Sequence, residues 1–75
     1  MNCFNIGRCD EKHPKVFIIY AQSRSEGIAK HIAYMYNRAY EATGQDTRLE
    51  VLSDIELAWK KYSHRYVGED PRFIY

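Results

Sequence analysis

A run of five consecutive β-branched and aromatic residues, Val16 to Tyr20, is the feature that most constrains the fold of this chain. Such a run predicts a strand that is covered on both faces or lies in the middle of a sheet. We therefore expect a strand over residues 15–21. The period then changes, because apolar positions recur at helical spacing from residue 24 to about residue 43. This pattern predicts a long amphipathic helix directly after the strand.

Polar signals mark both ends of the predicted helix. Ser23 and Glu26 have the spacing of a capping box, in which each side chain pairs with a backbone N–H group that the helix start leaves unpaired. Gly44 stands where a left-handed C-cap is expected. The apolar stripe that we expect to face the core consists of Ile28, Ile32, Tyr36, Ala39 and Thr43.

The second half of the chain repeats this order. Residues 47–52 alternate between apolar and polar side chains, which predicts a half-exposed strand. Ser53 and Glu56 form a second capping-box pattern. We expect a second helix from there to about Gly68. The apolar residues expected on its buried face are Ile55, Ala58, Trp59, Tyr62 and Tyr66.

The predicted fold is a small α/β domain, with α+β as the alternative, in the order β-α-β-α. Its sheet would have two strands in parallel, or three if an end of the chain adds one. We expect residues 1–14 to form a partly mobile N-terminal arm, 15–68 the single domain and 69–75 a loose tail. A chain of 75 residues makes one domain at most and leaves little material for a deep pocket, which favours a binding module over an enzyme.

Cys3, Cys9 and His13 form a C-x5-C-x3-H pattern that resembles part of a zinc site. Zinc usually takes paired cysteines two to four residues apart and needs four ligands. Here the cysteines are farther apart, and no fourth ligand is evident beyond Asp10, His31 or His64. We therefore expect reduced cysteines, no metal and no cofactor, with structural zinc or a disulfide between the two cysteines as the alternatives.

Two further chemistries can be argued against. Ser23 and Ser25 stand where flavodoxin-like proteins cradle a phosphate between a strand and a helix. However, the loop lacks the expected glycine, and helix capping explains both serines. The histidines, residues 13, 31 and 64, have no spacing that would place a base beside a nucleophile. We expect no catalytic residues.

Charge and hydropathy set broader limits. The chain has 11 basic and 10 acidic residues, for a net charge of +1, so only clustering of basic residues would favour nucleic acid as a partner. No signal-peptide pattern opens the sequence, and no apolar run approaches the roughly 20 residues that span a bilayer. We expect a cytoplasmic protein that is monomeric when free and does not bind membranes.

Two groups of basic and aromatic residues are predicted to bind a partner. The first lies on the face of the first predicted helix opposite Ile28 and Ile32, and it consists of Lys30, His31, Tyr34 and Arg38. The second lies on the predicted second helix and consists of Lys60, Lys61 and Arg65. For the first group, the alternative is a solvated helix face on which the Tyr34 ring packs under the aliphatic parts of Lys and Arg side chains. For the second group, the alternative is that the basic residues only complement the helix dipole.

Residues 16–52 resemble small phage-encoded host-takeover proteins, such as the short inhibitors of bacterial RNA polymerase. The resemblance rests on the pattern Ile-Tyr-Ala-x-Ser-x-x-Glu at 19–26, which leads into an amphipathic helix and a short strand. It implies a non-enzymatic regulatory protein, encoded by a phage or mobile element, that docks on and inhibits a bacterial protein complex such as RNA polymerase. This chain departs from the pattern in having Gly27 where alanine is usual, a basic exposed surface and an added C-terminal helix. No functional residue is carried over.

The alternative function is that of a small nucleic-acid-binding protein. It would use the basic helical surfaces to contact phosphates, with Tyr34 available to stack on a base. A metal-stabilised adaptor is a third hypothesis.

Overall fold

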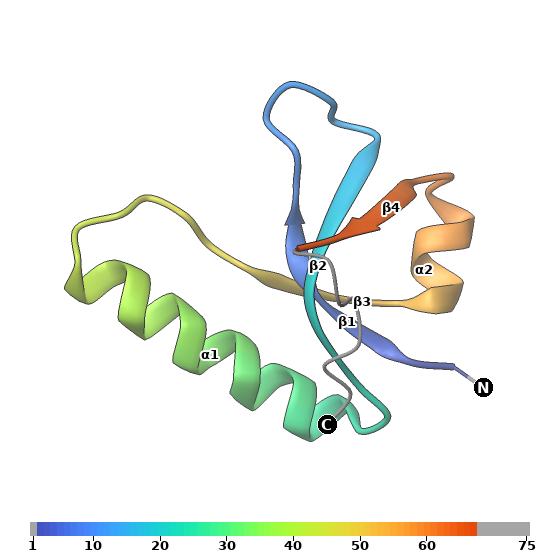
Figure 1. Ribbon diagram of the computed structural model, residues 1–75. Coiled ribbons are helices and arrows are strands. Elements are labelled where there is room, and N and C mark those ends of the chain that lie inside the picture. The colour runs from blue at the N-terminus through green and yellow to red at the C-terminus, as the bar shows by residue number, and fades with distance from the viewer. Residues whose placement is uncertain (1, 68–75) are drawn as a thin grey trace.

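The computed structural model describes residues 2–67, which form a four-stranded mixed sheet with one helix on each face (Figure 1). The elements follow in the order β1 (Phe4–Cys9), β2 (Val16–Ser23), α1 (Glu26–Ala42), β3 (Glu50–Ser53), α2 (Asp54–Trp59) and β4 (Ser63–Tyr66). The strand order in the sheet is β3-β1-β2-β4. The predicted small α/β class is confirmed, but with four strands in place of two or three.

β1 is the main difference from the sequence-based prediction of an N-terminal arm over residues 1–14. It lies in the middle of the sheet and pairs antiparallel with both β2 and β3. β2 and β3 are therefore parallel, as the strand–helix–strand order predicts, but β1 separates them. Asn5, Gly7 and Arg8 break the apolar alternation of β1, so its strand character arises from tertiary contacts. The tail predicted over 69–75 lies outside the described residues.

A β-bulge divides the apolar run of β2 between the two faces of the sheet. Ala21 pairs with Ile6, whereas Ile19 pairs with the next residue, Gly7, so Tyr20 is the extra residue in β2. Phe17 and Ile19 consequently pack in the cluster beside α2, and Ala21 packs in the cluster beside α1. The expectation of a central strand covered on both faces is confirmed.

α1 approaches the sheet through two alanines. Ala29 and Ala33 are buried, and their small side chains let the helix lie close to the strands. The predicted buried stripe is wrong in its phase, because Ile28 is about half exposed and Ala39 is exposed. The larger buried side chains of the cluster next to α1 come from the sheet and from the residue that precedes β3. The other buried members of this cluster are Ile6, Ala21 and Leu49.

The two ends of α1 were predicted with different success. Its N-cap is Ser25, whose hydroxyl accepts a hydrogen bond from the backbone N–H of Ile28 at 3.4 Å, and Ser23 lies outside the helix. The predicted Ser23–Glu26 capping box is therefore wrong by two residues. Gly44 has a φ of 74° and donates its N–H to Glu41, which confirms the left-handed C-cap.

α2 ends much earlier than the predicted boundary near Gly68. The Lys61 N–H donates to the Ala58 carbonyl, and the Tyr62 N–H donates to the Leu57 carbonyl. These bonds define a Schellman motif with Lys61 in the left-handed position at a φ of 56°. A lysine gives no stop signal, and the residues after it form β4, which pairs parallel with β2. The prediction that this segment is helical is wrong.

We expect Lys61→Gly to stabilise the domain by about 1 kcal/mol, because glycine adopts a positive φ without the steric strain that other residues incur. Urea unfolding followed by circular dichroism measures this change. Lys60→Gly is the matched control, since Lys60 has a φ of −80° that suits any residue. It should be neutral or slightly destabilising, and an equal gain in both variants would contradict the explanation.

Candidate partner-binding surfaces

The outward side of α1 carries a contiguous patch of exposed apolar, aromatic and basic side chains. The exposed fraction is 55% for both Tyr34 and Met35, and 48% for Ile28. Helical spacing places them beside His31 and Arg38, which are also exposed. We call this set, Ile28, His31, Tyr34, Met35 and Arg38, the α1 patch.

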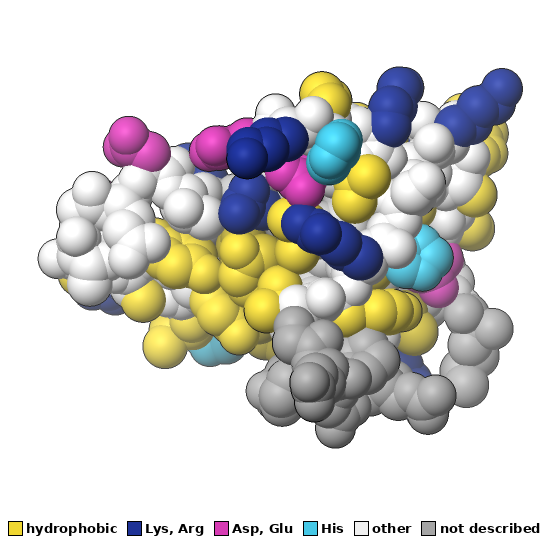
Figure 2. Space-filling model, turned by 45° about the horizontal axis from the view of Figure 1, so that its top comes forward, with side chains coloured by type: hydrophobic (Ala, Val, Ile, Leu, Met, Phe, Trp, Pro, Cys, Tyr) yellow, Lys and Arg dark blue, Asp and Glu magenta, His cyan; other side chains and the backbone are white. Residues whose placement is uncertain are grey.

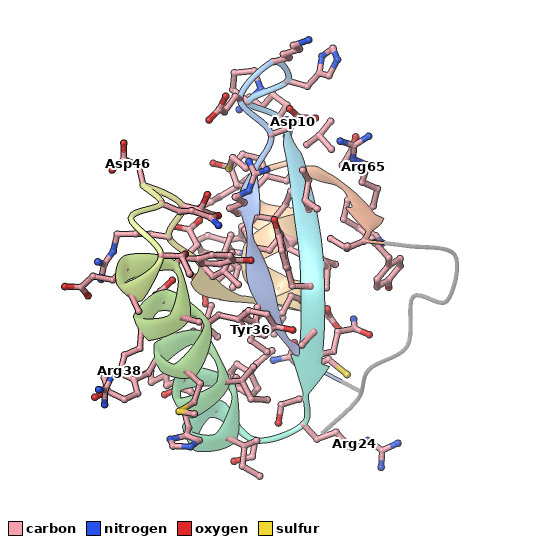
Figure 3. The ribbon with its side chains drawn as sticks, turned by 60° about the vertical axis from the view of Figure 1, so that its left-hand side comes forward. Asp10, Arg24, Tyr36, Arg38, Asp46 and Arg65 are labelled. Atoms are coloured by element: carbon pink, nitrogen blue, oxygen red, sulfur yellow. The ribbon has the colours of Figure 1, made fainter. Side chains whose placement is uncertain are left out.

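Tyr34 lies at the centre of an ordered group in the α1 patch. Arg38 Nη1 donates a hydrogen bond of 3.3 Å to the Tyr34 hydroxyl, and its guanidinium carbon lies 5.8 Å from the ring centroid. The His31 ring centroid is 6.5 Å from that of Tyr34. Arg38 projects away from the sheet (Figure 3). The structure thus brings the residues of the first predicted group together, with Lys30 at the edge of the patch paired to Glu26 at 3.3 Å.

The second predicted group does not form a helical surface. Lys60 caps α2, Lys61 is in the following turn, and Arg65 lies in β4. Arg65 Nη2 is 2.9 Å from Asp10 Oδ2, close to the loop that joins β1 and β2 (Figure 3). A hydrogen bond from the Lys12 backbone N–H, together with the charge of Arg65, lowers the pKa of Asp10. The seven predicted residues therefore lie on separate parts of the molecule.

α2 exposes two large apolar residues that were expected to be buried. Trp59 is 85% exposed and Ile55 is 58% exposed, whereas Leu57 is the residue of this helix that reaches the core. Leu57 lies about half a turn from both of the others, so either set could have faced the sheet. The adjacent surface is hollowed, with a volume of about 310 Å³, between Asp54, Leu57, Ala58, Tyr62 and His64.

Three tyrosines and an arginine lie between α1 and the sheet. The Tyr36 ring centroid is 6.0 Å from Tyr20 and 6.2 Å from Tyr40, and Tyr36 points toward the sheet in Figure 3. Arg8 Nε donates to the Tyr20 hydroxyl at 3.2 Å, and this bond raises the pKa of Arg8. Burial, with a smaller effect of Tyr20, raises the pKa of Tyr40.

This cluster is suited to packing and hydrogen bonding. A raised phenol pKa keeps Tyr40 protonated and weakens it as a nucleophile at neutral pH.

Figure 2 shows hydrophobic side chains as a band at the surface on the α1 side of the molecule, with Lys and Arg side chains along its border.

The residues considered for metal or phosphate chemistry are held apart or are engaged elsewhere. Cys3 and Cys9 stand at opposite ends of β1, about 20 Å apart along an extended strand, too far to share an ion or form a disulfide. Within residues 2–67 no three His, Cys, Asp or Glu side chains could hold a metal ion together. The Ser23 hydroxyl accepts from the Ser25 N–H at 3.1 Å, so both serines serve the start of α1.

In the described part of the chain no helix has the length and hydropathy needed to cross a bilayer. Comparisons with known protein families, with curated proteins and with solved structures found no match to this chain.

Proposed function

We propose that this protein is a non-enzymatic regulatory module that docks on a larger protein through the α1 patch. The observation that carries the proposal is the half-exposed pair Tyr34 and Met35 on a helix that already buries Ala29 and Ala33 against the sheet. The core does not need apolar side chains on both sides of this helix. Protein interfaces do use such sets, with Tyr, Met and Arg enriched among their central residues.

The resemblance to phage-encoded inhibitors makes a bacterial protein complex, with RNA polymerase first, the partner to test. The cytoplasm of a bacterial host would be the compartment. Nucleic acid is the second candidate partner, because Tyr34 and Arg38 could contact a base and a phosphate. Lys30 is paired with Glu26, however, so the basic charge at this surface is partly neutralised.

We expect Tyr34→Ala or Arg38→Ala to weaken capture of the partner by about 2 kcal/mol or more, since a central aromatic or Arg anchor carries much of an interface's binding energy. The measurement is retention of RNA polymerase and other lysate proteins on tagged protein, with and without nuclease. Both residues are exposed, so the free energy of unfolding should change by less than about 0.5 kcal/mol.

Arg48→Ala is the matched control, because Arg48 is exposed but lies outside the α1 patch. It should leave capture unchanged, and Lys60→Ala/Lys61→Ala should weaken it modestly and chiefly at low salt. Nuclease-sensitive capture, with a steep log-linear loss on adding salt, would indicate the nucleic-acid function instead. If Lys60→Ala/Lys61→Ala abolished capture and Tyr34→Ala left it unchanged, docking through α1 would be ruled out.

A further inference from the structure

The surface between α2 and β4 combines an apolar hollow with exposed apolar side chains. The hollow has a volume of about 310 Å³, and its lining includes Leu57, Ala58 and Tyr62. This is the lower end of the range for ligand sites, and it accommodates a single large side chain rather than a cofactor. Ile55 and Trp59 extend the apolar surface over the outer side of α2.

Two ammonium groups stand over the aromatic ring that lines this hollow. Lys15 Nζ is 5.6 Å and Lys60 Nζ is 5.9 Å from the Tyr62 ring centroid. The backbone fixes Lys15 here, because the Ser63 N–H donates to its carbonyl at 2.8 Å. His64 lines the hollow on the β4 side, and exposed Lys61 follows Lys60.

Among the described residues, no carboxylate forms an ion pair with these lysines. The ion pairs within residues 2–67 are Lys30–Glu26 and Arg65–Asp10, and neither includes these lysines. Asp54 is the acidic residue of the hollow, but its carboxylate is already hydrogen-bonded. Asp54 Oδ1 accepts from Asn5 Nδ2 at 2.8 Å, and Oδ2 accepts from the Cys3 N–H at 3.0 Å.

We propose that the α2–β4 surface binds an acidic peptide segment of a partner protein. One large apolar side chain of the segment enters the hollow beside Leu57, and flanking carboxylates pair with Lys15 and Lys60. Charge complementarity selects such a segment from other apolar ones. Trp59 is 85% exposed on the outer side of α2, about half a turn from Leu57, so the peptide contacts it where the peptide extends beyond the hollow.

A peptide fits these observations better than nucleic acid. Sequence-indifferent binding of single strands needs aromatic faces on which bases can stack. The exposed Trp59 ring lies about half a turn from Leu57, away from the hollow. The Tyr62 ring has lysine ammonium groups over it, and the lining of the hollow includes the aliphatic side chains of Leu57 and Ala58. The lysines are therefore placed to meet carboxylates at the rim of an apolar site.

This surface is distinct from the α1 patch, because α1 and α2 lie on opposite faces of the sheet (Figure 1). The proposal consequently does not depend on the proposed docking through α1. A variant that loses one activity should retain the other.

Trp59 provides a direct readout, since it is the single tryptophan of the chain. The probe is a short synthetic peptide of alternating glutamate with phenylalanine or leucine, titrated into the full-length protein. We expect a saturable blue shift of tryptophan emission as Trp59 becomes buried. Lys15→Gln/Lys60→Gln should weaken this binding about tenfold, the effect of losing two partly exposed ion pairs.

Lys12→Gln/Arg24→Gln is the matched control, because it removes the same charge from exposed positions outside the hollow. It should bind the peptide like the unmodified protein. The proposal is overturned if the peptide causes no shift, if both double variants bind equally, or if the glutamine version of the peptide binds as tightly. It is also overturned if an oligothymidine of equal charge competes with the peptide for binding. A blue shift of the Trp59 emission that depends on protein concentration in the absence of peptide would overturn it as well, because a second copy of the protein would then be the occupant.

Discussion

Gly7→Ala should unfold the domain or bring it close to unfolding. A Cβ atom at this position would lie 2.9 Å from the carbonyl carbon of Ile18, in closer contact with the attached oxygen, and 3.1 Å from Cα of Ile19. These are backbone atoms of the neighbouring central strand beside the β-bulge, so they cannot rotate away. We expect a loss of about 3 kcal/mol, at the upper end for overpacking, from a stability on the order of 5 kcal/mol.

Gly27→Ala is the matched control for this prediction. Gly27 is exposed in the first turn of α1, and the nearest atom to an added Cβ would be Ser25 Oγ at 3.9 Å. This substitution should be neutral or stabilise by about 0.5 kcal/mol through helix propensity. Urea unfolding of both variants tests the prediction. If the two variants unfolded at the same urea concentration, β1 would not pass as close to β2 as described.

Asn5→Asp should destabilise the domain in a way that depends on pH. Asn5 is fully buried, and its amide joins three parts of the fold. Asn5 Nδ2 donates to the Leu52 carbonyl at 3.0 Å and to Asp54 Oδ1 at 2.8 Å, while Asn5 Oδ1 accepts from Gln22 Nε2 at 2.8 Å. An oxygen in place of this nitrogen would face two acceptors, one of them a carboxylate.

We expect this variant to lose about 3–5 kcal/mol at neutral pH, as for an uncompensated buried charge. Burial and the facing carboxylate would raise the folded-state pKa of the introduced carboxyl group above its unfolded value. The folded state would then bind the proton more tightly, so stability should be regained as the pH falls through that raised pKa. Asn2→Asp, at an exposed position, is the control and should show little change. A loss of stability that did not vary with pH would contradict the proposed repulsion.

The parts of the fold with local signals were predictable from the sequence. The apolar run of β2, the helical period of α1, Gly44 and the Ser53–Glu56 capping box all appear where expected. β1 was expected only as an alternative, in which an end of the chain adds a strand, because its buried residues include Asn5 and Gly7. These residues serve a hydrogen-bond network and a close approach of strands. β4 was not predicted, because Lys61 ends α2 in a left-handed conformation that a lysine in the sequence does not indicate.

The candidate surfaces were also predictable only in part. α1 is apolar on a face wider than the sheet can cover, so the sequence could not determine which part packs inward. His31, Tyr34 and Arg38 could still be predicted as exposed, because they lie at least about 100° from both Ala29 and Ala33 around the helix. Lys30 lies closer to Ala33 and is exposed at the edge of the patch. The exposure of Trp59 could not be predicted in this way, since a helix as short as α2 has too few turns to define its buried face.

A photo-crosslinking methionine analogue at position 35, which leaves Tyr34 and Arg38 in place, tests docking through the α1 patch most directly. The control carries the same probe at position 47, on the loop between α1 and β3 and outside the patch. We predict a discrete adduct from position 35 that protease digests, nuclease leaves intact and Arg38→Ala weakens strongly, with no such adduct from position 47. Equal adducts from the two positions, or an adduct that nuclease removes, would contradict protein docking through this helix.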